Sequence, residues 1–380
     1  MNTPERSVVL VTCEYPPFPG GIATYAYGVA SSLVNNGCDA KVVAPLYPEM
    51  PSETETITVH RVLGHHKIGL SAVLKTFAVL RATPKGTLVL AADIRTVLML
   101  YCLRPVSRRN YRAMVHGSEA AKFKKGSLLF ALVRKAYMSA ELVAYNSQAT
   151  RDIFRRGIGA PENEAVTYLG VDPTWFVTVP GPFRYPQLAA IPEGTPVFCS
   201  VGRIEPRKGQ LETVRALGLA KKKYGLTDAV YVVAGRPEDD RYTDEVVREA
   251  EALSVELIMT GRLEDDDLHR LYRRSTCHCL LAQDLPGKIE GFGLVLLEAA
   301  AQMCPTIASK VGGIPEVLAN TGALVNSDDL DGAAKMLAKY ASEPEMRRVE
   351  GELASKRASE FTWDACAAKT FPEYFSLRSE

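Results

Sequence analysis

The sequence predicts an α/β protein made of two doubly wound domains, each with a parallel sheet. Short runs rich in β-branched residues alternate with segments of helical spacing, which is the pattern of βαβ units. The length of 380 residues suits two domains that each bury a core. An apolar fraction of 47% and a charged fraction of 23% are typical of a globular protein.

The first half of the chain is expected to hold six strands. Between the first two, apolar residues from Ile22 to Val34 recur at helical spacing, and Asn36-Gly37 is a typical helix end. The predicted strands cover residues 8–12, 41–44, 88–91, 113–116, 142–145 and 166–169. This series predicts a first domain over residues 1–180.

The second half repeats the alternation after a proline-rich stretch, residues 173–192, which is typical of an interdomain linker. Strands are predicted at 197–201, 229–234, 256–259, 276–281 and 306–308, with helices at 210–223, 243–253, 265–274 and 293–301. The second domain is predicted over 181–361. Residues 362–380 contain Trp363 and helical spacing, so we expect this segment to pack back on the first domain.

The chain starts with a short polar segment, and no uncharged apolar run reaches membrane-spanning length. We therefore expect no signal peptide and a cytoplasmic location. The eight cysteines form no Cys-x-x-Cys pair and mostly lie in apolar runs, which favours buried free thiols. Cys277-His278-Cys279 alternate along a predicted strand and point to opposite faces, so a core strand is preferred over a metal site.

The net charge of +1 is unevenly distributed. Residues 1–180 hold 20 Lys and Arg against 13 Asp and Glu. Much of the excess lies in a basic tract, residues 104–135, which we expect to bind an anionic acceptor or a membrane surface. An apolar helix buried against the sheet is the alternative for residues 128–133. The cations of the tract are Arg104, Arg108, Arg109, Arg112, Lys122, Lys124, Lys125, Arg134 and Lys135, against the single acid Glu119.

The most informative motif runs from Glu290 to Glu298, with a Gly-Phe-Gly turn that opens an apolar helix. Glycines let a backbone approach a ligand closely, and a helix N-terminus favours a diphosphate. Because carboxylates accept hydrogen bonds from hydroxyls but repel phosphate, we assign the two glutamates to sugar rings. A plain helix start with solvated glutamates is the alternative.

Two further loops follow predicted strands, where open α/β sheets bind ligands. Gly20-Gly21 open the first helix and offer N–H groups to a phosphate, although a tight turn is an equal alternative. Arg203 and Lys208 suit a diphosphate, with Arg207 as an unmatched extra cation. Solvated loop charge is the alternative.

Two other groups of polar residues were weighed. His116 ends a predicted strand, where it either points into a cleft or is capped. Residues 265–267 are three aspartates that precede a helical pattern, so an acidic helix N-terminus is preferred over a metal-binding Asp-x-Asp.

Together these motifs resemble the retaining glycosyltransferases of family 4, which have two Rossmann-like domains in the GT-B arrangement. The similarity covers nearly the whole chain and depends on the order of its motifs. Gly20-Gly21 resemble the glycines of the first loop, and His116 resembles the active-site histidine of the first domain. Arg203 and Lys208 resemble the diphosphate clamp, and Glu290 to Glu298 the Glu-x7-Glu element. Val311-Gly312-Gly313 is similar to the turn that follows.

The resemblance implies a role for each matching residue. Glu290 is expected to bind the donor sugar, which Gly291, Phe292 and Gly293 line. The amides of Leu294 and Val295 are expected to face the diphosphate, Glu298 the ribose, and Arg262 and Leu263 the base through their backbone. Such enzymes move a hexose-type sugar from UDP or GDP to a hydroxyl of a glycan, glycolipid or small molecule. They use front-face attack, without metal or cofactor.

One segment departs from the family pattern, because residues 282–289 lengthen the approach to Glu290 and bring in Asp284 and Lys288. This difference leaves the sugar open. Two alternatives to a transferase were also weighed: a non-catalytic protein that binds nucleotide sugars, and a sugar-nucleotide epimerase of the same architecture. A nucleic-acid partner is not expected. A glycosidase is disfavoured because Glu298 lies within a helix.

Overall fold

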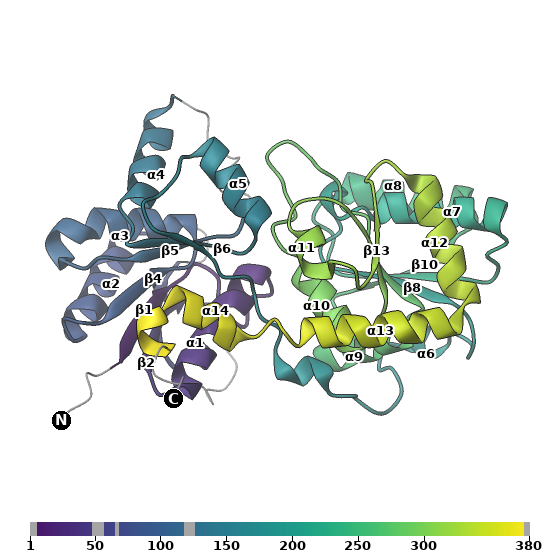
Figure 1. Ribbon diagram of the computed structural model, residues 1–380, viewed down its shortest axis with the longest axis horizontal. Helices are drawn as coiled ribbons and strands as arrows, with labels where there is room; N and C mark the ends of the chain where they lie inside the picture. Colours follow the sequence, from purple (N-terminus) through teal and green to yellow (C-terminus); the bar gives the residue numbers. More distant parts are fainter. Residues whose placement is uncertain (1–5, 48–56, 65–67, 118–125, 376–380) are drawn as a thin grey trace. The chain divides into compact units, whose positions relative to one another are not determined.

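The computed structural model describes residues 6–47, 57–64, 68–117 and 126–375 (Figure 1). The chain divides into two compact units. Unit 1 comprises Met1–Gly170 and Thr362–Glu380, and unit 2 comprises Val171–Phe361. Each unit is an α/β structure with one parallel sheet, as the sequence predicted.

The sheet of unit 1 has the strand order β3-β2-β1-β4-β5-β6-β7, and all neighbouring strands are parallel. The order reverses between β1 and β4, so the loops after these two strands flank the switch point. The strands are β1 Ser7–Val11, β2 Asp39–Pro45, β3 Thr58–Leu63, β4 Leu88–Ala91, β5 Arg112–Val115, β6 Leu142–Tyr145 and β7 Glu164–Val166. The helices are α1 Gly21–Asn35, α2 Leu70–Ala82, α3 Ile94–Ser107, α4 Leu128–Met138, α5 Gln148–Gly157, α14 Trp363–Thr370 and α15 Pro372–Phe375.

The sheet of unit 2 has the order β10-β9-β8-β11-β12-β13, with its switch point between β8 and β11. Its strands are β8 Val197–Val201, β9 Val230–Ala234, β10 Glu256–Gly261, β11 Cys277–Leu280, β12 Thr306–Ser309 and β13 Ala323–Val325. Its helices of eight or more residues are α7 Gln210–Tyr224, α8 Asp240–Ala252, α9 Asp265–Arg274, α10 Leu294–Ala301, α12 Leu330–Ser342 and α13 Pro344–Ala358. Shorter helical segments are η2 Pro173–Phe176, α6 Pro186–Ala189, η3 Pro206–Lys208 and α11 Ile314–Leu318.

Apolar side chains from both faces of each sheet form the cores. In unit 2, Cys277 and Cys279 lie in one apolar cluster with Val214 and Leu337, while Cys199 belongs to the cluster on the other face. The cysteines described are free, and most are buried, as expected for core thiols. No helix in the described part of the chain has both the length and the apolar character needed to cross a bilayer.

All eleven predicted strands are present, but two edge strands were not predicted. β3 carries the polar His60 and Arg61 and is only partly buried, and β13 has three residues. Neither has the buried apolar run on which the prediction relied. β7 covers Glu164–Val166 instead of the predicted 166–169, and the positive φ of 52° at Tyr168 is incompatible with an extended strand through residue 169.

Residues 171–180 belong to unit 2, whereas the predicted first domain extended to residue 180. The indole of Trp175 stacks on the ring of His269, with 4.3 Å between centroids. The amide of Gln302 donates to the carbonyls of Trp175 and Val177. These contacts tie the segment to α9 and α10, which explains why it leaves unit 1.

The C-terminal segment packs on α1 of unit 1 (Figure 1). The carboxylate of Asp364 accepts hydrogen bonds from Ser32, at 2.6 Å, and from Asn36. The ring of Trp363 lies on Gly28, where an added Cβ would be 2.3 Å from the indole. In α15, Glu373 pairs with the buried Arg112 of β5. The segment is therefore part of the core of unit 1.

Four cations of the basic tract are used inside the unit. Arg104, Arg109 and Arg134 donate to the backbone carbonyls of Ser139, Thr83 and Ile158, and Arg112 pairs with Glu373. Lys122, Lys124 and Lys125, like Glu119, lie outside the described residues. Of the tract's other cations, Arg108 and Lys135 are exposed. Part of the positive charge of the tract therefore serves the fold.

The contact between Gly28 and Trp363 leads to a stability prediction. Gly to Ala within a helix normally stabilises by about 1 kcal/mol. Here the added methyl group overlaps a rigid ring, so Gly28→Ala is expected to destabilise unit 1 and to release the C-terminal segment to proteolysis. Chemical unfolding and limited proteolysis measure the two effects.

Gly69→Ala is the control without a clash, because Gly69, the N-cap of α2, has a φ of −84° and no atom within 4 Å of an added Cβ. A Gly28→Ala protein as stable and as protease-resistant as Gly69→Ala would contradict the packing described here.

Candidate functional site

Two loops meet at the switch point of unit 2. The first follows β8 and runs from Gly202 to Gly209, and the second follows β11 and ends at Gly293. Gly209 has a φ of 72°, and an added Cβ would be 1.8 Å from the carbonyl oxygen of Leu281. The N–H of Gln283 donates to the carbonyl of Arg207 at 3.0 Å. Glycine at position 209 thus lets the two loops lie directly against each other.

Glu290 is held by its backbone as well as by its side chain. The N–H of Gly313 donates to the Glu290 carbonyl at 3.0 Å. Gly312 has a φ of 54°, and an added Cβ would be 2.0 Å from the same oxygen. The Val311-Gly312-Gly313 motif therefore supports Glu290, because only glycine permits this approach.

The carboxylate of Glu290 is buried between two cations. Its Oε2 accepts a hydrogen bond from Lys208 Nζ at 2.8 Å and another from Arg207 Nη1. Burial alone would raise the pKa of this carboxyl, but Lys208 and Arg207 outweigh burial and lower it. Glu290 is therefore ionised at neutral pH.

Arg207 is not an unmatched cation, so that prediction was wrong. Its side chain is 10% exposed, and its Nη2 donates to Glu205 Oε1 at 2.7 Å while Nη1 contacts Glu290. Burial would lower the pKa of Arg207, but the two carboxylates raise it. The sequence did not show these partners, because Glu290 is 83 residues away.

Further charges extend this cluster toward solvent. Glu205 Oε1 is 3.1 Å from Arg203 Nη2, and Glu205 Oε2 is 3.7 Å from Lys288 Nζ. Arg203 also approaches Glu238, which pairs with Arg236. These ion-paired groups comprise five cations (Arg203, Arg207, Lys208, Lys288 and Arg236) and three carboxylates (Glu205, Glu238 and Glu290). The excess of two positive charges matches the two negative charges of an esterified diphosphate.

The two predicted clamp residues have different surroundings. The side chain of Arg203 is 47% exposed, so it is accessible to a ligand. Lys208 is largely buried on Glu290; burial lowers its pKa, and Glu290 opposes that shift. Lys208 is thus held on Glu290 rather than exposed to solvent.

Helix α10 begins beside Glu290. Gly293 is its N-cap, with a φ of 89° and no side-chain cap, so the first-turn amides, including those of Leu294 and Val295, point beyond the helix. Phe292 is 2% exposed and packs on Phe361, with 5.8 Å between ring centroids. Contrary to our expectation, the ring of Phe292 therefore does not line a ligand. Only the backbone of Gly291, Phe292 and Gly293 remains for that role.

Glu298 lies on α10, eight residues after Glu290. Its Oε2 accepts a hydrogen bond from the hydroxyl of Tyr272 at 3.2 Å. Burial raises the pKa of Glu298 to about 7, although Tyr272 lowers it. Tyr272 is buried on α9 and was not among the predicted site residues. Leu263 packs its side chain in the core next to exposed Arg262, so their backbone contacts with a base stay a prediction.

Unit 1 contains a second group of candidate residues at its own switch point. Gly20 and Gly21 open α1, whose N-cap has no side-chain hydrogen bond, and a Cβ on Gly20 would be 3.3 Å from Glu14 Oε2. His116 directly follows β5, and its Nε2 donates to the carbonyl of Ala92 at 2.9 Å. The His116 ring packs edge-on against Tyr25. His116 thus lies at the end of a strand, as predicted, and Gly20-Gly21 lie at the start of the first helix, as predicted.

The residues weighed as metal ligands have structural roles. Asp267 accepts hydrogen bonds from the N–H of Arg184 and from Arg270, in the first turn of α9. His278 is buried in β11. Within the described ranges, no group of three or more His, Cys, Asp and Glu side chains is placed to hold a metal ion.

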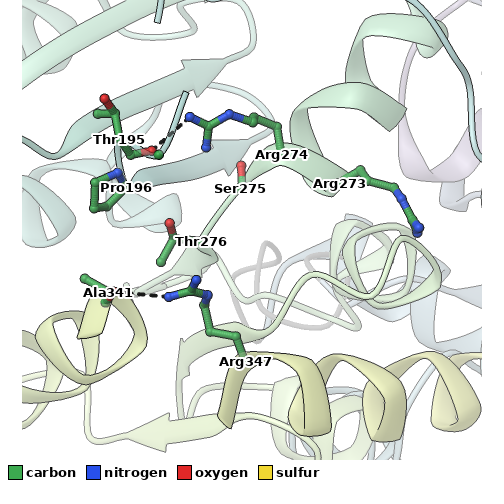
Figure 2. A pocket seen from close by; sticks show the side chains of 9 residues that line it. Thr195, Pro196, Arg273, Arg274, Ser275, Thr276, Ala341 and Arg347 are labelled. Carbon is green, nitrogen blue, oxygen red and sulfur yellow. Dashed lines mark hydrogen bonds between the residues drawn. The ribbon is translucent and has the colours of Figure 1, made fainter. Parts of the chain in front are cut away.

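A pocket at the opposite edge of the sheet does not belong to this site. Figure 2 shows Pro196, Ser275 and Thr276 in its wall, residues that precede β8 and β11. Arg274 donates to the carbonyls of Pro192 and Thr195, and Arg347 to those of Tyr340 and Ala341. These guanidinium groups cap backbone carbonyls at the amino ends of the strands, whereas the charged cluster lies at the carboxyl ends.

Two family models match consecutive parts of the chain. Glycosyltransferase Family 4 matches residues 19–175, and Glycosyl transferases group 1 matches residues 184–357. A GDP-mannose-dependent alpha-(1-6)-phosphatidylinositol monomannoside mannosyltransferase of Mycolicibacterium smegmatis is 26% identical over 363 residues, covering 90% of this chain and 91% of the relative.

Solved structures share the fold over nearly the whole chain. Sucrose-phosphate synthase from Thermosynechococcus elongatus has a TM-score of 0.77 at 19% identity and covers 98% of this chain and 99% of its own. Anabaena HepE in complex with UDP-glucose has a TM-score of 0.75 at 17% identity, covering 98% and 100%. The strand orders, the cluster around Glu290 and these matches agree: the chain belongs to the group 1 glycosyltransferases of the family 4 type, with the GT-B fold.

Proposed function

We propose that this glycosyltransferase moves a hexose from a nucleotide-diphosphate sugar to a hydroxyl acceptor with retention of configuration. The observation that supports this proposal most directly is the cluster around Glu290. It combines two excess positive charges with a buried, ionised carboxylate beside the start of α10. Cations and first-turn amides suit the diphosphate, and the carboxylate suits the sugar hydroxyls.

The proposed reaction follows from these charges. As the bond between the sugar C1 and the diphosphate oxygen breaks, Arg203, Lys208 and the amides of α10 stabilise the negative charge on the leaving group. The acceptor oxygen bonds to C1 on the same face, and its proton passes to the leaving phosphate oxygen. Glu290 orients the sugar and forms no covalent bond. No step in this scheme requires a metal ion.

The relatives suggest which substrates to test first. The Mycolicibacterium relative is named for GDP-mannose and a phosphatidylinositol mannoside, and Anabaena HepE was solved with UDP-glucose. We propose GDP-mannose as the first donor and UDP-glucose as the second. We propose an inositol-bearing glycolipid as the first acceptor, because it offers hydroxyls for the reaction and a phosphate that carries negative charge.

A transfer assay in EDTA tests the proposal. Purified protein with GDP-mannose or UDP-glucose and an inositol glycolipid is expected to release the nucleotide and form an α-linked product. Arg203→Ala and Lys208→Ala are each expected to lower kcat about a hundredfold, roughly 3 kcal/mol, because each removes a charge from the leaving group.

The product and its anomeric configuration are read by NMR. Donor binding without turnover would favour a non-catalytic binding protein, and conversion of the donor sugar without an acceptor would favour an epimerase. Activity that requires added Mg²⁺ or Mn²⁺ would contradict the metal-free scheme.

The raised pKa of Glu298 predicts that donor binding depends on pH. Ribose hydroxyls donate to the ionised carboxylate, and this form is lost below a pKa of about 7. The dissociation constant is therefore expected to increase as pH falls from 8 to 6. Calorimetry with GDP-mannose or UDP-glucose measures it, since an esterified diphosphate does not itself titrate in this range.

Glu298→Gln keeps the size of the side chain and removes its titration. This variant is expected to bind more weakly at pH 8 and with little pH dependence. An equal pH dependence in wild type and variant would show that another group is responsible.

We also propose that α4 contacts an anionic membrane surface. Leu128, Leu129 and Leu132 are 92%, 50% and 39% exposed, although the expected alternative was a buried helix. The neighbouring Lys135 is exposed too, and lipid-facing leucines next to cations suit an anionic bilayer. The buried face of α4 is formed by Val133, Ala136 and Tyr137.

Liposome co-sedimentation at low salt tests this contact. Vesicles with phosphatidylinositol are expected to capture more protein than phosphatidylcholine vesicles, and the double variant Leu128→Gln, Leu129→Gln is expected to lose the difference. Leu353→Gln, at a 49% exposed position on α13, is the control. Equal capture by both vesicle types would leave α4 without a membrane role.

A further inference from the structure

Arg207 is the central cation of the cluster and is almost inaccessible. One end of its guanidinium contacts Glu205 Oε1 at 2.7 Å, and the other contacts Glu290 Oε2. Both carboxylates are buried, with side chains 5% and 8% exposed. A planar guanidinium that is bound at both ends fixes the distance and the angle between its two partners.

The contacts of Glu290 are confined to one of its oxygens. Lys208 and Arg207 both donate to Oε2, and no hydrogen bond to Oε1 occurs among the residues that the structure describes. Lys208 is a point charge on a flexible chain and by itself leaves the carboxylate plane free to rotate. Arg207 adds the second direction that fixes the plane and leaves Oε1 for another donor.

Glu205 is the anchor for the far end of Arg207. Its Oε1 also approaches Arg203 at 3.1 Å, and its Oε2 approaches Lys288 at 3.7 Å. For Arg207 to bind a diphosphate directly, it would have to give up one of two buried carboxylates and leave that charge unpaired, which is costly. The exposed cations Arg203 and Lys288 can turn toward an anion at much lower cost.

We infer that Arg207 is a positioning residue that holds the Glu290 carboxylate so that Oε1 faces the donor sugar, while Glu205 anchors Arg207. This inference depends on the proposed function for the identity of the ligand at Oε1. The effect of Arg207 on Glu290 itself does not depend on that function. Two kinds of measurement therefore separate the two ideas.

The first measurement needs no substrate. The pKa of Glu290 is followed by NMR of carboxyl-labelled glutamate, with the signal assigned by its loss in Glu290→Gln. Arg207→Met is expected to raise this pKa, because one of the two cations that lower it is removed. Arg207→Lys is expected to return it toward the wild-type value. A Glu290 pKa that is unchanged in Arg207→Met would overturn the inference.

The second measurement is transfer kinetics with GDP-mannose or UDP-glucose. Arg207→Met is expected to lower kcat about tenfold with little change in the donor KM, and to shift the acid limb of the pH profile upward. Arg207→Lys restores the charge but not the fork, so its pH profile recovers more than its kcat. A kcat that recovers fully with lysine would show that charge alone matters and would refute positioning.

Two further variants complete the design. Arg215→Met is the matched control, because Arg215 pairs with Glu245 and Glu249 of α8 and with no group of the cluster. Its kcat and Glu290 pKa are expected to equal those of wild type. Glu205→Gln frees the far end of Arg207 without touching Glu290, and it decides the question if Arg207→Met does not fold. It is expected to lower kcat in the same direction, and a wild-type kcat there would overturn the inference.

If the wild-type protein transfers no sugar, the proposed function fails, and the NMR measurement still decides whether Arg207 controls Glu290. If the wild-type enzyme is active and Arg207→Met matches it in kcat and pH profile, the positioning inference fails alone.

Discussion

The ion-paired contact between Glu290 and its two cations is the interaction on which the site of unit 2 depends. An unpaired buried carboxylate is costly, and removing one partner of a buried pair commonly costs about 3–5 kcal/mol. Here Arg207 and Lys208 keep Glu290 ionised, and Glu205 in turn neutralises Arg207. Each charge of the cluster therefore depends on its partners, and this explains why the adjacent cations Arg207 and Lys208 occur together with the nearby Glu205 and the distant Glu290.

Glycine permits the backbone geometry that this cluster requires. The loops after β8 and β11 approach so closely at Gly209 that a side chain there would overlap the carbonyl of Leu281. Gly312 does the same for the carbonyl of Glu290. The sheet order reverses between β8 and β11, so both loops follow strands at the switch point, where open α/β sheets bind ligands. Sheet topology and two glycines thus place the charges before any ligand arrives.

The site is prepared differently at its two glutamates. The carboxylate of Glu290 contacts the cations Arg207 and Lys208 and has a lowered pKa. The carboxylate of Glu298 accepts a hydrogen bond from the hydroxyl of Tyr272 and has a pKa of about 7. The first carboxylate is charged whether or not a ligand is present. The second gains most from hydroxyl donors that stabilise its charge. The two carboxylates therefore suit the roles that we propose, a constant contact of Glu290 to a sugar and a pH-dependent contact of Glu298 to a ribose.

The sequence by itself determined the fold class, the strands that carry buried apolar runs, and the loops that hold the site. Period and composition are local properties, so β4, β6 and β8 were predicted to the residue. Edge strands β3 and β13 were missed because they are short or half-polar, and the wider Glu290 cluster was missed because its members are far apart in the chain. Only the tertiary structure decided that Arg207 is buried between two carboxylates, that Phe292 faces the core, and that Trp175 ties residues 171–180 to unit 2. The position of each of these side chains depends on the residues that it contacts from other parts of the chain. Local sequence spacing does not show which residues those are.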